Sequence, residues 1–234
     1  MSEKIRLLFA GKKSYVLAAG AAVILAAILL IAGLTAREVL ITGVLLGDDR
    51  EVPLSACAAL DAGFLESKGL DPATREIRLA RNLDYSGNNT DPSFVNNFTA
   101  IDKLDDYVSQ GMLDFVLGDA DSLCSLAYSD FFTDLRQILT PEQLESWAPR
   151  LRYMDLAVIE QLEEMALTKE YPEDFTLPDP GKPEEMIQPV PVFLDVTGFP
   201  GTADLWPDSQ VYYAVALNTE HPTIVRDYAA YLVG

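Results

Sequence analysis

The longest apolar run of the chain is Ser14–Ala36, close to the N-terminus, and it contains no charged residue. In a helix that rises about 1.5 Å per residue, a run of this length crosses a hydrocarbon core of roughly 30 Å. A helix in a soluble core normally keeps a polar face, which this run lacks. The pattern therefore predicts a transmembrane helix that anchors the rest of the chain to a lipid bilayer.

The basic residues on the two sides of this run predict its orientation. Four of them precede it (Lys4, Arg6, Lys12 and Lys13), whereas Arg37 alone follows closely. Because basic residues tend to stay in the cytoplasm, we expect a cytoplasmic segment at 1–13 and an extracytoplasmic domain at 37–234, in a single-pass protein of the cell membrane. Two alternatives stay open. One is a cleaved secretory signal, whose apolar region usually spans about 7–15 residues; the other is a reversed topology.

After the predicted anchor, the pattern alternates between strands and helices. Continuous or alternating apolar residues predict strands over 38–47, 77–83, 113–117, 190–197 and 211–218. Helical spacing and capping signals predict helices over 53–68, 94–110, 123–128, 141–147, 155–167 and 222–232. One of these signals is the capping box Thr140-Pro141-Glu142-Gln143. Six prolines between positions 171 and 191 predict an extended connector there.

This order of elements predicts the fold class. Strands and helices alternate through the first half of the domain, which favours an α/β fold with a mostly parallel sheet and helices on both faces. Residues 37–234 are enough for one domain with a full core.

The ends of the predicted strands supply the candidate site, because ligands of such sheets bind outside the carboxyl ends of the strands. The first three strands lead into Gly47-Asp48-Asp49, Asp84-Tyr85-Ser86 and Gly118-Asp119-Ala120-Asp121. Their oxygen ligands suit a hard cation, and aromatic side chains could stack on a sugar or an organic cation. Helix capping and core packing are the structural alternatives. The candidate ligand-binding residues are Asp48, Asp84, Tyr85, Asp119, Asp121 and Trp206.

The net charge of the chain limits the classes of partner that it can bind. It carries 36 acidic and 17 basic residues, and residues 37–234 alone have a formal net charge of −22. Such a domain repels nucleic acid, so we expect no nucleic-acid partner. Solubility is one explanation of this charge, and attraction of cationic ligands is the other.

The chain contains few residues that could ligate a metal or act in catalysis. Cys57, Cys124 and His221 cannot form a Cys/His zinc site of ordinary spacing, and we expect no dedicated metal site and no cofactor. The two cysteines are either buried thiols or, outside a cell, a disulfide. His221 precedes Pro222 at a helix start, where we assign it a structural role.

The chain has no phosphate loop and no nucleophile elbow, so we expect no enzymatic activity. A hydrolase with paired carboxylates is the less favoured alternative.

Three stretches resemble the type 2 periplasmic-binding-protein fold of extracellular solute-binding proteins. The first is KLDDYVSQGMLDFVLGDADSLCSLAYSDFFTDLRQIL (Lys103–Leu139), similar to the family's helix, strand and helix. The second is VYYAVALNTEHPTIVRDYAAYLV (Val211–Val233), similar to its strand, N-x-x-H/N-P turn and amphipathic helix. The opening strand and helix are the third.

The resemblance covers one lobe. Ser125–Pro189 holds too little for a second lobe with its own sheet, and an anchor replaces the lipoprotein cysteine that these proteins usually carry. The chain is therefore similar to a reduced solute-binding protein, and it also resembles uncharacterised bacterial single-pass membrane proteins of this length.

The resemblance implies a non-catalytic binding protein that takes a small solute or a cation at the strand ends. The alternative is a structural or accessory envelope protein that binds a membrane partner such as a transporter. The expected partners are thus the bilayer, through Ser14–Ala36, and either a small solute or a membrane protein.

Overall fold

A computed structural model describes residues 37–47, 52–85, 94–168, 172, 175–199, 201–203, 205–206 and 209–234. Within it, Val39–Gly234 form one compact unit. The predicted cytoplasmic segment, the predicted anchor Ser14–Ala36 and the candidate residue Asp48 lie outside the described residues. Among the residues described, no helix is both long enough and apolar enough to cross a membrane.

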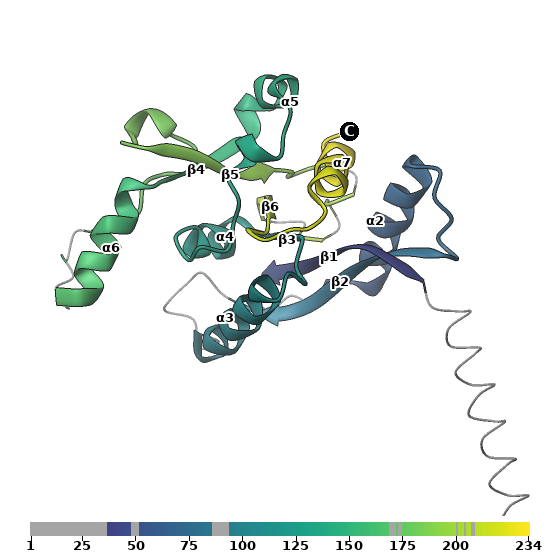
Figure 1. The fold of residues 1–234 in the computed structure, drawn as a ribbon, viewed down its shortest axis with the longest axis horizontal. Helices are drawn as coiled ribbons and strands as arrows, with labels where there is room; N and C mark the ends of the chain where they lie inside the picture. The colour runs from purple at the N-terminus through teal and green to yellow at the C-terminus, as the bar shows by residue number, and fades with distance from the viewer. Residues whose placement is uncertain are drawn as a thin grey trace, which may run out of the picture. The chain divides into compact units, whose positions relative to one another are not determined.

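Six strands in the described part of the chain form one sheet, in the order β2-β1-β3-β6-β5-β4. The strand β1 lies second from one edge of the sheet, between β2 and β3, and it is almost continuously apolar because both of its faces are covered. Figure 1 shows β1 and β2 running in the same direction. The strands are β1 (Glu38–Gly47), β2 (Arg75–Asp84), β3 (Phe115–Asp119), β4 (Leu151–Asp155), β5 (Pro189–Asp195) and β6 (Val211–Val215).

The sheet is mixed, which corrects the prediction of a mostly parallel sheet. β1 and β3 are parallel, with Val44 opposite Val116. The pairs β3–β6, β6–β5 and β5–β4 are all antiparallel. A parallel neighbour needs a long crossover such as α2 (Leu54–Ser67) between β1 and β2, whereas a loop connects β5 to β6. The helical crossovers of the first half gave no information about the second half.

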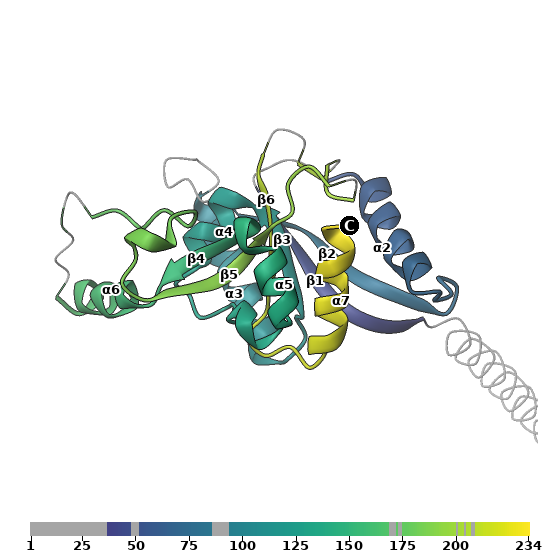
Figure 2. The ribbon, with the colours of Figure 1, turned by 90° about the horizontal axis from the view of Figure 1, so that it is seen from above.

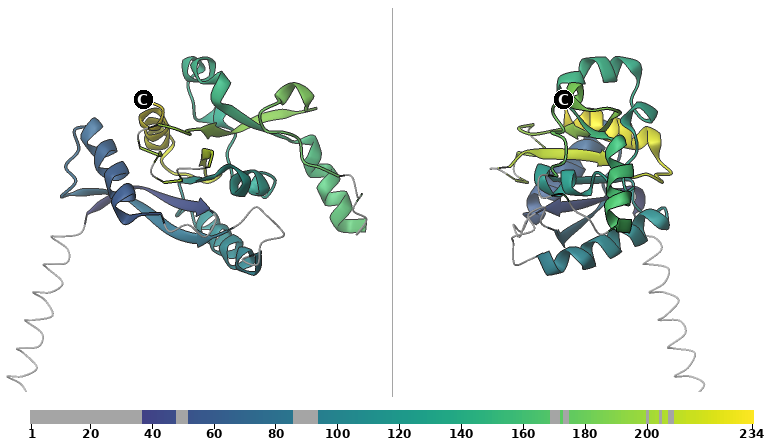
Figure 3. Two further views of the ribbon diagram at one scale, coloured as in Figure 1. Left: turned by 180° about the vertical axis from the view of Figure 1, so that it is seen from behind. Right: turned by 90° about the vertical axis from the view of Figure 1, so that its left-hand side faces the viewer.

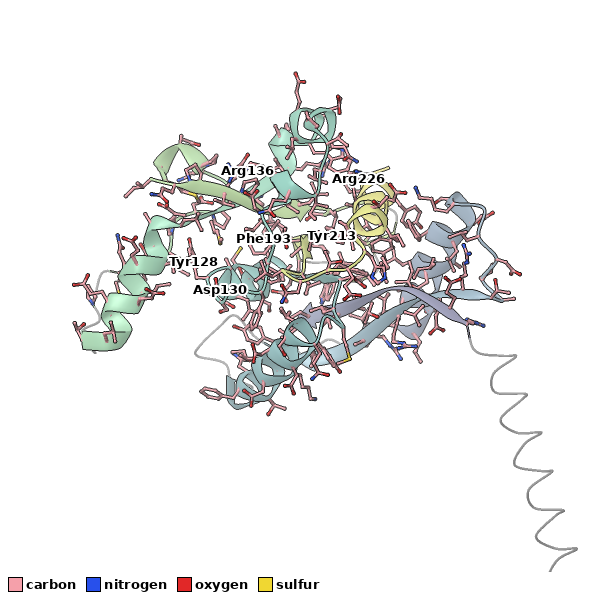
Figure 4. All side chains as sticks on the ribbon, in the orientation of Figure 1. Tyr128, Asp130, Arg136, Phe193, Tyr213 and Arg226 are labelled. Carbon is pink, nitrogen blue, oxygen red and sulfur yellow. The ribbon has the colours of Figure 1, made fainter. Side chains whose placement is uncertain are left out.

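Helices cover both faces of the sheet, as predicted. Apolar side chains of α2 and α7 (Pro222–Leu232) pack on one face with those of β1, β3 and β6. Those of α3 (Phe94–Ser109) and α4 (Ala120–Leu126) pack on the other face. Figures 1 and 2 show α7 on the side of the sheet opposite α3, and the views of Figure 3 agree. Phe193 of β5 and Tyr213 of β6, both fully buried, lie near the middle of the sheet (Figure 4).

The segment between α4 and β5 departs most from the prediction. α5 (Pro141–Ser146) begins with the predicted capping box, in which Thr140 and Gln143 bond reciprocally. The strand β4 was not predicted, because Leu151–Asp155 is short and half-buried at the sheet edge. It leads into α6 (Ala157–Thr168). The predicted connector ends early, since a 3₁₀ turn forms at Pro183–Glu185 and β5 begins at Pro189.

The two cysteines are free thiols. Cys57 of α2 belongs to the apolar cluster on one face of the sheet, and Cys124 of α4 packs against the cluster on the other. The disulfide alternative is therefore wrong, and the prediction of a buried thiol is confirmed for Cys57, whereas Cys124 is only partly buried. Burial raises the pKa of the Cys124 thiol to about 12, with a further contribution from Asp121 and Asp119, so neither metal binding nor disulfide chemistry is favoured there.

Two buried polar atoms without hydrogen-bond partners belong to α2 and α7, which pack on the same face of the sheet. The side-chain atom Oδ1 of Asp61 is buried and has no hydrogen-bond partner, and the hydroxyl of Tyr228 is in the same condition. Burial, and secondarily the charge of Glu76, raises the pKa of Asp61 to about 7. The neighbouring ion pair of Lys68 with Asp227, at 2.8 Å, joins the same two helices. Ionised Asp61 therefore weakens a contact that the rest of the interface stabilises.

We predict that Asp61→Asn stabilises the domain above pH 7. Because the pKa of Asp61 is higher in the folded than in the unfolded chain, stability falls as pH rises from roughly 4 to about 7. One pKa unit is about 1.4 kcal/mol, and discounting for solvent screening leaves a gain of about 1–2 kcal/mol at pH 8. Urea unfolding at pH 5 and pH 8 measures it. Glu66→Gln, an exposed change on the same helix, should keep the pH profile of the wild type; an unchanged profile in Asp61→Asn would contradict the assignment.

Candidate functional site

The site is built around Asp114, which immediately precedes β3. Its side chain is only 5% exposed. Oδ2 accepts a hydrogen bond from the backbone N–H of Thr42 at 2.8 Å, and the Asp114 N–H donates to the carbonyl of Thr42 at 2.8 Å. A buried carboxylate is stable only when donors surround it. The first of these donors is the backbone N–H of Thr42 in the neighbouring strand β1.

The other donors come from the loop that joins β6 to α7. The hydroxyl of Thr219 lies 2.7 Å from Asp114 Oδ1, and Nδ1 of His221 lies 2.9 Å from the same oxygen. Since an ionised carboxylate only accepts, Nδ1 carries the proton and Nε2 is the ring nitrogen left for another partner. The backbone of Ala216 also donates to the Asp114 carbonyl at 2.9 Å. Asp114 thus fixes the orientation of the imidazole.

A cavity of about 430 Å³ adjoins this pair. It lies between the amino-terminal parts of β1 and β2, the end of α3 and the loop before α7. The lining residues are Val39, Thr42, Arg78, Ala80, Tyr107, Gly111, Met112, Asp114 and His221.

The wall contributed by α3 depends on how that helix ends. Gly111 has a φ of +64°, a conformation that favours glycine. Its N–H donates to the carbonyl of Val108 at 3.0 Å, and the N–H of Met112 donates to the carbonyl of Tyr107 at 2.9 Å. This is the Schellman pattern, which brings the residue after the glycine back against the last helical turn. It places Met112 and Tyr107 together in the wall of the cavity.

The lining is apolar apart from a few groups. Arg78 is on the same face of β2 as Ala80, and its side chain is 61% exposed. His221 stands at the rim with 43% of its side chain exposed. The lining includes neither serine nor cysteine beside the imidazole, and among the described residues no group of acidic, histidine and cysteine side chains could hold a metal ion. Such an open cavity can hold a small molecule and bind it through the guanidinium, the imidazole Nε2 and the tyrosine hydroxyl.

The structure brings some of the sequence-predicted residues together at the opposite end of β3. Asp119 caps α4, because Oδ1 accepts from the N–H of Ser122 at 3.0 Å and Oδ2 lies 2.9 Å from its hydroxyl. That hydroxyl is also 3.1 Å from the carbonyl of Tyr85. The hydroxyl of Tyr85 bonds Ser125 at 2.8 Å, and burial raises its pKa. Asp119 and Tyr85 are therefore neighbours that share one helix start.

Trp206 also lies at the carboxyl end of β3, where its indole packs closely against the backbone of Gly47. A Cβ added to Gly47 would lie 2.6 Å from the indole Nε1 of Trp206 and 3.0 Å from Oδ2 of Asp119. The indole is 3% exposed, and Nε1 has no hydrogen-bond partner. Asp121 is exposed in the first turn of α4. Asp84 ends β2, but its side chain and all of Asp48 lie outside the described residues. The carboxyl-end site stays a prediction.

The cavity beside Asp114 and the cluster around Asp119 lie at opposite ends of the strand β3. Asp114 precedes β3 and Asp119 ends it, so they are roughly 17 Å apart at about 3.4 Å per residue. Sequence reasoning missed the cavity because it searched only the carboxyl ends and gave His221 a structural role. The signal that was available was the buried-strand context of Asp114, in Leu-Asp-Phe, together with the one histidine of the chain.

Comparisons with protein-family models, with curated proteins and with solved structures found no match to this chain.

We predict that Asp114→Ala destabilises the domain by about 2–4 kcal/mol, because the donors of Thr42, Thr219 and His221 lose a buried acceptor. Urea unfolding measures the change. Asp105→Ala, an exposed position on α3, is the control and should change stability by less than about 0.5 kcal/mol. Equal stability of the two variants would contradict the role given to Asp114.

Asp119 and Asp121 allow a paired test of capping at the carboxyl end. Asp119→Ala removes the side-chain acceptor at the start of α4 and should cost about 1 kcal/mol. Asp121→Ala removes an exposed charge and should be close to neutral. The same unfolding assay compares them. If Asp119→Ala leaves stability unchanged and abolishes binding of a ligand, the residue is a ligand-binding residue and not a cap.

Proposed function

We propose that this protein is a membrane-anchored, extracytoplasmic, non-catalytic binding protein, and that it binds a small organic solute in the cavity beside Asp114 and His221. One observation carries the proposal, the volume of about 430 Å³. Ligand pockets of proteins typically measure about 300–1,000 Å³ and combine an apolar lining with a few fixed polar groups. This cavity meets both conditions.

The fixed orientation of His221 supports binding. A polar group that is already held in place loses little conformational entropy when a ligand arrives. Hydrogen bonds within the protein, to Asp114 and Thr219, hold the imidazole and the loop before α7. The solute therefore meets a preorganised hydrogen-bonding group.

The lining favours binding over catalysis. An imidazole oriented by a carboxylate needs an adjacent hydroxyl or thiol to act in the manner of a hydrolytic triad. Among the described residues that line the cavity, the hydroxyls belong to Thr42 and Tyr107, and neither type commonly serves as the nucleophile of such a triad. The function we infer is reversible binding.

The sequence supports the location. Ser14–Ala36 has the length and apolarity of a transmembrane helix, and the basic residues before it favour a cytoplasmic N-terminus. The resemblance to one lobe of a solute-binding protein is consistent with a binding domain outside the cell. We therefore propose that the solute is bound on the extracytoplasmic side.

We predict that filling the cavity abolishes binding. The full chain is screened by thermal shift against amino acids, sugars, polyamines, nucleotides, organic acids and calcium. A ligand at 100 times its Kd adds about 2.7 kcal/mol of stability. Ala80→Leu places a larger side chain in the wall of the cavity, so it should remove the shift without lowering the stability of the free protein.

Ala62→Leu, at an exposed position of α2, is the matched control and should bind as the wild type does. Binding that persists in Ala80→Leu would place the ligand elsewhere, with the carboxyl-end residues as the next position to test. A panel without any shift, combined with co-purification of a membrane protein, would favour the accessory envelope protein instead.

A further inference from the structure

We propose that the solute is an organic acid, a small molecule with one carboxylate on an apolar body, and that Arg78 binds its carboxylate. This inference rests on the proposed function and names the ligand class of the same cavity. It reverses the expectation from composition, because a domain with a formal net charge of −22 would be expected to attract cations.

The first step is that the acidic group of the cavity is already engaged. Asp114 is the acidic residue among the described residues lining the cavity. Both of its oxygens accept hydrogen bonds, one from Thr42 and the other from Thr219 and His221. These three hydrogen bonds occupy most of the acceptor capacity of the carboxylate, and the side chain is only 5% exposed to an incoming cation. The cavity is therefore a poor site for an amine.

The second step is that the cationic group of the cavity is available. The guanidinium of Arg78 is 3.3 Å from Glu76 Oε1 through a single nitrogen, with the two side chains 61% and 32% exposed. A solvent-exposed ion pair of this kind contributes little to stability. A guanidinium offers five donors and binds a carboxylate with two parallel hydrogen bonds, which is stronger. A carboxylate ligand can therefore displace Glu76 or share the guanidinium with it.

The third step concerns the rest of the ligand. Val39, Ala80, Met112 and the ring of Tyr107 give the remaining wall an apolar character. Burying apolar ligand surface against these side chains favours binding. The imidazole Nε2 of His221, at the rim, can accept a hydrogen bond from a hydroxyl or amide of the ligand. A small dicarboxylate would place a second charge against apolar side chains, so a monocarboxylate fits best.

The fourth step weighs the net charge against these contacts. Charges separated by more than the Debye length, about 8 Å at physiological ionic strength, are largely screened. The acidic surface therefore slows the approach of an anion more than it weakens the bound state. Contacts inside the cavity determine which charge is selected.

The test uses molecules that share a body and differ in their polar group. One set is phenylacetate, 2-phenylethylamine and 2-phenylethanol; the other is hexanoate, hexylamine and hexanol. Calorimetric titration of the full chain should give binding of the acids and at least 10-fold weaker binding of the amines and alcohols. Arg78→Gln should weaken the acids at least 10-fold and bring them to the level of the alcohols.

Arg81→Gln is the matched control. It removes the same charge from the same strand, but Arg81 faces the α2 side of the sheet, where its charge acts on Cys57. It should keep the affinity of the wild type for the acids. The thermal midpoints of the two variants without ligand show whether both are folded, and the exposure of Arg78 predicts that Arg78→Gln is.

The outcomes separate this inference from the proposed function. Alcohols or amines that bind as well as the acids, or acids that bind Arg78→Gln as they bind the wild type, would overturn the organic-acid assignment. If any of these molecules binds and Ala80→Leu removes the binding, the cavity is still the site of the proposed function. If none binds and the wider panel is also silent, both inferences fail.

Discussion

The buried carboxylate of Asp114 is the constraint on which one end of this domain depends. Charge inside a protein is unfavourable unless donors compensate it, and these donors come from β1 and from the loop after β6. Segments 72 and 107 residues away in the chain are thereby held at one point. Hydrogen bonds to this one carboxylate hold the start of β3, the adjacent strand β1 and the loop before α7 together. They also fix the orientation of the His221 imidazole.

The cavity follows from the side chains that meet beside this point. On the same face of the sheet, Val44, Leu46 and Leu104 pack a fully apolar core. Nearer the start of the strands, β2 offers Arg78 and Ala80. Protein interiors are normally close-packed by large apolar side chains. Ala80 is too small to fill the space beside β2, and the charged Arg78 extends toward solvent, so this space stays open. Because the end of α3 turns back at Gly111, Tyr107 and Met112 line this space and do not close it.

The sequence was sufficient where local signals were strong. The predicted helix 222–232 is confirmed at both ends, and the capping box at Thr140 forms as expected. β4 was missed because Arg152, Tyr153 and Met154 are only half-buried, so its five residues show no apolar run. The mixed sheet was missed because strand direction depends on pairing between distant segments, which periodicity does not encode. The structural role predicted for His221 agrees with its bond to Asp114 at the start of α7, but periodicity could not identify that partner because it is far away in the chain.

The two ends of β3 show why strand direction alone does not locate a ligand. At the carboxyl end, Asp119, Ser122 and Tyr85 bond to one another, and Gly47 has no room for a side chain between Trp206 and Asp119. Polar groups there are largely used in holding the fold together. At the amino end the carboxylate is equally occupied, but the side chains around it leave a volume of about 430 Å³. A ligand needs both unfilled space and polar groups that are not yet engaged. Beside this volume, Arg78 pairs with Glu76 through one exposed nitrogen, and the outer nitrogen of His221 faces away from the bond that Nδ1 makes to Asp114. Packing therefore favours the amino end for a ligand, even though strand order favours the carboxyl end.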